Sequence, residues 1–143
     1  FSFPKSSRIM SNALKTAHLR IARPTDRLDE IVDFYRTVLG FSVLSEFRDH
    51  DEFDGVMLGH SGAPYHLEFT SKAGHEVGRS PTEDILLVFY IPDRSEWVET
   101  ISMIESQGYS AVKSFNPFWE VAGKTFEDPD GYRIVIQNSE WSR

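Results

Sequence analysis

Hydrophobic and polar positions follow a regular order along the first half of the chain. Residues 18–22 alternate in the manner of a strand. Apolar residues then recur at helical spacing over 28–39, with Thr25 or Asp26 as the predicted N-cap and Gly40 at the C-terminal end. Three short strand-like runs follow, at 41–47, 56–58 and 65–70. The first half therefore predicts one strand, one helix and three further strands.

The second half repeats this order. Residues 85–91 form a predicted strand that ends at Pro92, and the sequence DRSE at 93–96 is a capping-box variant that starts a helix running to Gly108. Three more strands are predicted, at 111–113, about 121–127 and 132–137. The acidic turn at 128–131 joins the last two of these strands.

The residues that end the first strand and the helix recur at the same spacing in both halves, which indicates an internal duplication. Pro24 and Pro92 are 68 residues apart, as are Gly40 and Gly108. We therefore expect one domain over 16–143, built from modules at about 16–72 and 83–138. Residues 1–15 carry three basic residues and no acidic one, and we interpret them as a flexible arm or the remnant of a tag.

Two segments carry a resemblance to a known superfamily. The sequences DFYRTVLGF at 33–41 and EDPDGYRIVIQ at 127–137, inside a duplicated frame, resemble the vicinal oxygen chelate superfamily, which includes glyoxalase I, bleomycin-resistance proteins and extradiol dioxygenases. The resemblance implies an α+β fold of two tandem βαβββ modules, with mixed sheets curved around a ligand cavity and the helices outside. It also implies a homodimer, because relatives often complete their cavities across a two-fold interface.

Composition narrows the possible partners. The 143 residues are 40% hydrophobic and 26% charged, which is typical of one folded domain, and no apolar run approaches the roughly 18 residues of a membrane helix. A formal net charge of −7 disfavours nucleic acids and anionic membranes as partners. The absence of cysteine excludes disulfides and thiolate metal sites, and it fits a cytoplasmic protein.

Strand alternation predicts which side chains line the implied cavity. If Leu67 packs beneath the helix, then His66 and Glu68 face the cavity, as do His18 and Arg20 on the first strand. The corresponding positions of the second module are Leu86, Val88, Tyr90, Arg133, Val135 and Gln137.

The resemblance also implies where a metal ion would bind. Metal-using relatives place up to four His or Glu ligands on these strands, and here only His18 and Glu68 match, because Val135 and a leucine occupy the other two positions. His66 makes a His18/His66/Glu68 set geometrically possible. The alternative is a neutral His18 that is hydrogen-bonded to Glu68. A divalent metal therefore stays open, and no organic cofactor is expected.

Two arginines and an aromatic loop are the candidate ligand contacts. Arg20 and Arg133 either grip an anionic or carbonyl-bearing molecule, with Glu68 or His66 as general base, or form salt bridges that hold the two halves in register. The aromatic run 115–119 is interpreted as a pocket wall with Trp119 on the ligand, the alternative being core packing. Tyr90 and Gln137 complete the predicted ligand-binding set.

Two functions follow as hypotheses. The first is a small-molecule-binding protein of the bleomycin-resistance type that lacks a complete metal site. The second is a metal-dependent lyase or dioxygenase of the glyoxalase or dioxygenase type that uses His18 and Glu68. The two hypotheses differ in their dependence on a metal ion.

Overall fold

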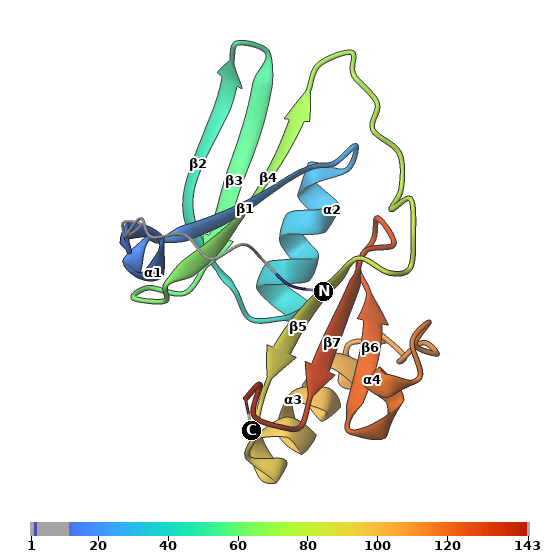
Figure 1. Cartoon of the computed structure of the whole chain (residues 1–143). Helices are drawn as coiled ribbons and strands as arrows, with labels where there is room; N and C mark the ends of the chain where they lie inside the picture. The colour runs from blue at the N-terminus through green and yellow to red at the C-terminus, as the bar shows by residue number, and fades with distance from the viewer. Residues whose placement is uncertain (1, 3–11, 143) are drawn as a thin grey trace.

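The chain forms two mixed β-sheets that share one helical layer (Figure 1). The structure, a computed structural model, describes Ser2 and residues 12–142, so most of the predicted N-terminal arm lies outside the described residues. The arm ends in a short helix, α1 (Ala13–Thr16). The first sheet has the strand order β1-β4-β3-β2 and consists of β1 (Leu19–Pro24), β2 (Ser42–His50), β3 (Phe53–Gly59) and β4 (Tyr65–Lys72).

The second sheet repeats this plan with one strand fewer. Its order is β5-β7-β6, and it consists of β5 (Leu86–Tyr90), β6 (Gly123–Glu127) and β7 (Arg133–Gln137). In each sheet one pair is parallel, β1 with β4 and β5 with β7, and the other pairs are antiparallel. Two mixed sheets in βαβββ-like modules confirm the predicted α+β class.

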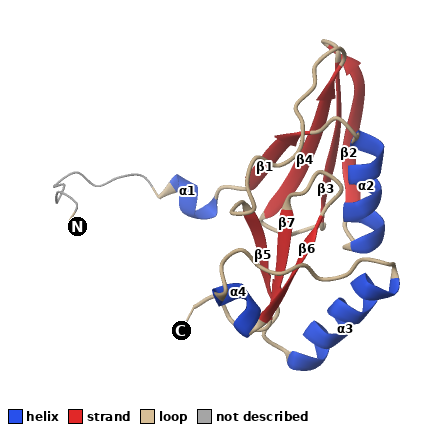
Figure 2. Cartoon of the chain, turned by 90° about the vertical axis from the view of Figure 1, so that its right-hand side faces the viewer, coloured by secondary structure: helices blue, strands red, loops and turns tan. Residues whose placement is uncertain are grey.

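The helices lie on one side of both sheets (Figure 2). This layer consists of α2 (Leu28–Asp33), which continues as the π-helix η1 (Phe34–Val38), and α3 (Arg94–Ser106). A fourth helix, α4 (Phe118–Val121), lies on the opposite side of the second sheet from α3. Among the described residues, no helix covers the second face of the first sheet, whereas the second sheet has a helix on each side. No helix in the described part of the chain is long and apolar enough to cross a membrane.

Aromatic packing joins the two modules into one core. Phe34 meets Tyr109 edge-on with ring centroids 5.1 Å apart, and Phe41 meets Phe89 edge-on at 5.9 Å. Each pair takes one ring from each module, so the modules bury apolar surface against each other. Leu67 is fully buried beneath the helices, as strand alternation predicts.

The predicted first helix changes geometry halfway along. Leu39 N donates to Phe34 O, and Phe41 N donates to Tyr35 O, so the last turns are wider than an α-helix. The wider turn places the adjacent Phe34 and Tyr35 both in the core, each 1% exposed. Gly40, with φ of +78°, ends the helix as predicted.

The predicted N-caps of this helix are wrong. Arg27 immediately precedes the helix, and neither Thr25 nor Asp26 caps it. The Asp26 carboxylate instead accepts the backbone N–H groups of Val77 and Gly78, each at 2.8 Å, and these bonds lower the pKa of Asp26. Asp26 thus anchors the linker between the modules.

The predicted strand at 111–113 is also wrong, because the structure contains only an isolated bridge between Val112 and Thr125. The next predicted strand begins late, at Gly123, because the preceding residues form α4. Asn116 Oδ1 accepts the Phe118 N–H at 3.0 Å and turns the chain into this helix. Segment 111–121 therefore covers the second sheet instead of extending it.

A buried ionic network also connects the modules. Arg23 donates through Nη2 to Asp128 Oδ2 and through Nη1 to Asp130 Oδ2, both at 2.8 Å. The Tyr35 hydroxyl donates to the same Asp128 oxygen at 2.8 Å, and the Tyr132 ring lies 4.0 Å from the Arg23 guanidinium carbon. Salt bridges between the halves, which the sequence offered as an alternative role for other arginines, are thus made by Arg23.

Candidate functional site

Four polar side chains gather on the open face of the first sheet. In the parallel pair β1–β4, Arg20 is opposite His66 and Ala22 is opposite Glu68. Paired residues present their side chains to the same face of a sheet, and His18 is two residues from Arg20. The structure therefore brings His18, Arg20, His66 and Glu68 together, on the face that alternation predicts. We call this group the Arg20 cluster.

Hydrogen bonds in the Arg20 cluster determine where the protons are. Arg20 Nε donates to His66 Nε2 at 2.8 Å, and Arg20 Nη1 donates to Glu68 Oε2 at 3.3 Å. Since a guanidinium can only donate, His66 Nε2 is an acceptor and the single proton of this imidazole is on Nδ1. That N–H donates to His18 Nε2, 2.6 Å away. His18 is therefore bonded to His66 and not to Glu68.

The surroundings of His66 keep its imidazole neutral. Desolvation lowers the pKa of His66, and the charge of Arg20 and the neighbouring His18 lower it further, while Glu68 acts in the opposite direction. A lowered pKa agrees with the hydrogen-bond pattern, in which His66 accepts from Arg20. The cluster thus has one cation, one carboxylate and two histidines in a chain of hydrogen bonds.

This arrangement does not fit a metal ion. The lone pair of His66 Nε2 is held by Arg20, and the lone pair of His18 Nε2 is held by His66. A metal needs these lone pairs, whereas the Arg20 guanidinium already places a positive charge between His66 and Glu68. Within the described residues, no group of three or more His, Cys, Asp or Glu side chains is arranged to hold a metal.

Part of the cluster remains open to a ligand. The Arg20 side chain is 47% exposed, and its Nη2 group donates to no residue in the described ranges. Met57, opposite Glu68 in the β3–β4 pair, presents an apolar side chain on the same face. The Phe47 ring packs directly over Gly55, in the space that a Cβ of residue 55 would take. The free Nη2 group of Arg20 thus lies on the same sheet face as the apolar side chain of Met57.

The second module uses its predicted arginine differently. Arg133 is 6% exposed; its Nη1 donates to Lys113 O at 2.9 Å, and its Nη2 donates to Glu83 and Glu127, each at 3.1 Å. No hydrogen bond or ion pair among the described residues joins Arg133 to the Arg20 cluster. Arg133 lines a separate pocket of about 180 Å³ together with Trp119. Ligand contact by either residue stays a prediction.

The remaining predicted residues share the face of the second sheet opposite to the core residues Ile134 and Ile136. In the β5–β7 pair, Leu86 is opposite Arg133, Val88 is opposite Val135, and Tyr90 is opposite Gln137. Tyr90 is exposed, whereas Gln137 is buried and its Oε1 has no partner among the described residues. The structure brings neither of them to the Arg20 cluster.

Sequence reasoning missed Arg23, although a signal was present. Arg23 occupies the strand face that holds Ile21, where a charge needs buried partners. Asp128 and Asp130 in the acidic turn are those partners, and they are 4% and 2% exposed. An arginine on an apolar face, together with an acidic turn in the duplicated module, indicates such a pairing.

The chain matches two family descriptions, the YycE-like N-terminal domain over residues 19–70 and the YycE-like C-terminal domain over 84–138. The uncharacterized protein YycE of Bacillus subtilis (strain 168) is 46% identical over 129 residues, which cover 90% of this chain and 93% of YycE. The chain belongs to the YycE-like family. The two family matches together span both modules.

Solved structures agree on the fold of the YycE-like chain. A YycE protein of unknown function from Bacillus subtilis has a TM-score of 0.81 at 46% identity, covering 89% of this chain and 93% of that one. Leishmania major glyoxalase I has a TM-score of 0.66 at 20% identity, covering 85% and 86%. TnmS3, an antibiotic binding protein from Streptomyces sp. CB03234, has a TM-score of 0.60 at 19% identity, covering 85% and 93%. The predicted glyoxalase/bleomycin-resistance fold is thereby confirmed.

Proposed function

We propose that this YycE-like protein binds a small monocarboxylate with an apolar body at the Arg20 cluster, without a metal ion. The free Nη2 edge of Arg20 is the observation that carries the proposal. A guanidinium edge binds carboxylates through charge-assisted hydrogen bonds, and the apolar body would lie over Met57. The net charge of −7 and the nearby Glu68 disfavour multiply charged anions. A relative of the same fold is named as an antibiotic binding protein, which agrees with a binding role.

Benzoate, an aromatic monocarboxylate, is a suitable probe. We expect its addition to raise the Tm of the wild type, because a ligand that binds only the folded state stabilises it. Arg20→Ala should weaken benzoate binding at least about tenfold, since a charged hydrogen bond is lost. Arg36→Ala is the matched control, because Arg36 is an exposed arginine outside the cluster. Equal Tm shifts in wild type and Arg20→Ala would contradict the proposal.

A catalytic role of the same cluster is a second proposal. Glu68 Oε1 accepts no hydrogen bond from the described residues, so Glu68 is the better base, whereas the His66 Nε2 lone pair is occupied by Arg20. A carboxylate in this position could take a proton from carbon next to a carbonyl. Pyruvate in D₂O tests this by NMR. The proposal expects methyl-proton exchange above the buffer rate that is lost in Glu68→Gln, and exchange at the buffer rate in the wild type rejects it.

The open face also supports a homodimer. Leu44 is 44% exposed and lies on this face, because its side chain and that of His66 both approach Gly59. A second copy packed on this face would cover Leu44 and enclose the Arg20 cluster. Sedimentation equilibrium should give twice the mass of the 143-residue chain. A monomer at all protein concentrations would reject this assembly.

A further inference from the structure

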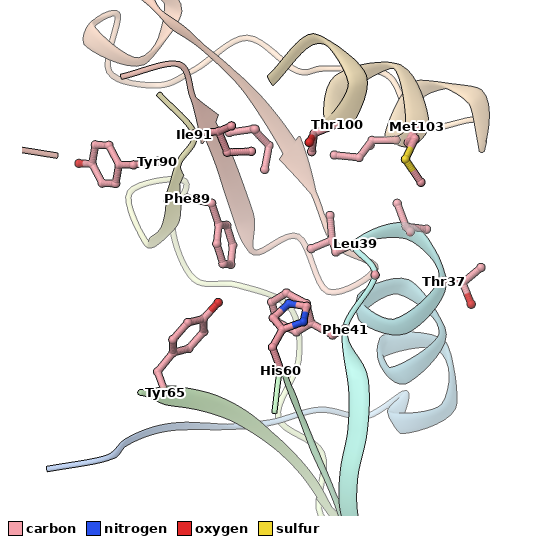
Figure 3. Close-up of a pocket in the computed structure, with 14 residues that line it drawn as sticks. Thr37, Leu39, Phe41, His60, Tyr65, Phe89, Tyr90, Ile91, Thr100 and Met103 are labelled. Carbon is pink, nitrogen blue, oxygen red and sulfur yellow. The ribbon is translucent and has the colours of Figure 1, made fainter. Parts of the chain in front are cut away.

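A cavity lies between the modules, away from both the Arg20 cluster and the pocket lined by Arg133. Its volume is about 390 Å³, within the range of small-molecule sites. Figure 3 shows the walls of this cavity. Leu39 and Phe41, which follow η1, lie on one side, and Phe89 and Ile91 of the second module lie on the other. Met103 of α3 lies along the rim. The wide π-helical turn of η1 ends at this wall.

The cavity opens on the helix side of the sheets. Tyr65 is on the same strand face as the buried Leu67, opposite to His66 and Glu68. Phe89 pairs with Ile136, which belongs to the core. A ligand in this cavity would therefore not touch the Arg20 cluster, and the two sites are separate.

The chemistry of the lining is neutral. No Asp, Glu, Lys or Arg is among the lining residues, most of which are apolar. The Tyr65 hydroxyl and the His60 imidazole make no hydrogen bond to any residue within the described ranges, and Figure 3 shows both beside the cavity. Desolvation raises the pKa of Tyr65, so its phenol stays protonated and can donate a hydrogen bond. His60 lies edge-on to Phe41 with ring centroids 4.8 Å apart.

We propose that this cavity binds a neutral, mainly aromatic or alicyclic small molecule that carries one polar group facing Tyr65. A charged ligand would lose its hydration without gaining an ion pair here. An uncharged ligand buries its apolar surface against Phe41 and Phe89, and its polar group satisfies the Tyr65 hydroxyl. The flexible thioether of Met103 adapts the rim to the shape of the ligand.

The neutral fluorescent probe N-phenyl-1-naphthylamine tests the proposal on the full chain. We expect saturable fluorescence enhancement at one probe per chain. Met103→Glu should weaken binding at least tenfold, because it places a charge at the rim. Val98→Glu is the matched control and should stay within twofold, since Val98 is an exposed apolar residue of the same helix that does not line the cavity. Tyr65→Phe should weaken binding about three- to tenfold.

Three outcomes would overturn the proposal. Equal weakening by Met103→Glu and Val98→Glu would show that the probe binds general apolar surface. Undiminished binding in Met103→Glu would place the probe elsewhere. Sedimentation of the same variants is the third readout, and a change of oligomeric state in Met103→Glu alone would make the cavity a subunit interface. Because benzoate binding depends on Arg20, failure here leaves the result for the Arg20 cluster unaffected.

Discussion

Arg20 supplies the positive charge at the centre of its cluster. Its guanidinium cannot lose a proton at physiological pH, so it fixes the acceptor nitrogen of His66 and, through it, the hydrogen bond to His18. Glu68 balances this charge at 3.3 Å. One arginine therefore sets the protonation of the two histidines and leaves an edge for an anion.

The titration of His66 tests this arrangement. Its pKa should lie below about 6.5, the value of an unperturbed histidine, and should rise in Arg20→Ala because one cause of the shift is removed. A lowered pKa means that the unfolded state binds more protons than the folded one near pH 6. The stability that His66 contributes is complete above about 6.5 and is lost as the pH falls through the folded-state pKa.

Histidine NMR over pH 4–8 measures the effect, and His75→Gln serves as the control because His75 is an exposed linker residue. A His66 pKa above 6.5, or one that does not respond to Arg20→Ala, would contradict the cluster geometry.

Sequence alternation predicted the shared face of the residues in the Arg20 cluster. It did not predict the partner of His18, because the choice between His66 and Glu68 depends on side-chain geometry that period-two patterning does not contain.

Among the elements, α3 is the one that local sequence specifies most completely. Asp93 has an extended backbone and accepts the Glu96 N–H at 2.9 Å, as the capping pattern predicts. The first helix follows its apolar pattern less closely, because the π-helical turn adds a register change that helical periodicity cannot show. The strand prediction for segment 111–121 is wrong for a related reason. Side-chain hydrogen bonds of Asn116 and Glu120 fold this segment over the sheet, and periodicity does not show them.

Removing the α3 cap should destabilise the protein. The hydrogen bonds from Ser95 and Glu96 lower the pKa of Asp93, so its contribution is present above about 3.8 and is lost as the pH falls through the folded-state value. Asp93→Ala should therefore lower Tm more at pH 7 than at pH 2.5. Thermal unfolding followed by circular dichroism measures this, with Asp93→Ser as a variant that keeps a cap. An equal loss at both pH values would show that Asp93 acts in another way.

At the scale of the whole molecule, a buried network of three charged side chains links the two modules beside the apolar core. The Arg23 side chain is 15% exposed, and the side chains of its partners Asp128 and Asp130 are 0% and 3% exposed. The duplication and the fold class can be predicted from the sequence, because they depend on the residues that end helices and strands and on hydrophobic periodicity. The Arg23 network joins residues more than 100 positions apart, and no local pattern specifies such a distance.

Arg23→Ala should lower the free energy of unfolding by about 3–5 kcal/mol, because it removes the guanidinium that neutralises two buried carboxylates. Arg27→Ala is the control and should cost about 1 kcal/mol or less, since its ion pair to Asp130 is half exposed. Urea unfolding measures both. A cost for Arg23→Ala no larger than for Arg27→Ala would contradict the role of the network.

The pH dependence of this variant adds a second criterion. Burial raises the pKa of Asp128, and Arg23 opposes that shift, so removing Arg23 raises it further. A carboxyl whose pKa rises on folding contributes stability at low pH that is lost as the pH rises through its folded-state value. The destabilisation by Arg23→Ala should therefore be smaller at pH 4 than at pH 7, and a cost independent of pH would indicate lost packing alone.

Metal content tests the central claim most directly. Protein purified without metal-affinity resin should contain far less than one transition-metal ion per chain by mass spectrometry, and dialysis against Zn²⁺ or Mn²⁺ should add none that depends on His18 or Glu68. The reason is that Arg20 and the hydrogen-bonded histidines occupy the lone pairs a metal would need. About one ion per chain, lost in both His18→Ala and Glu68→Ala, would contradict the account.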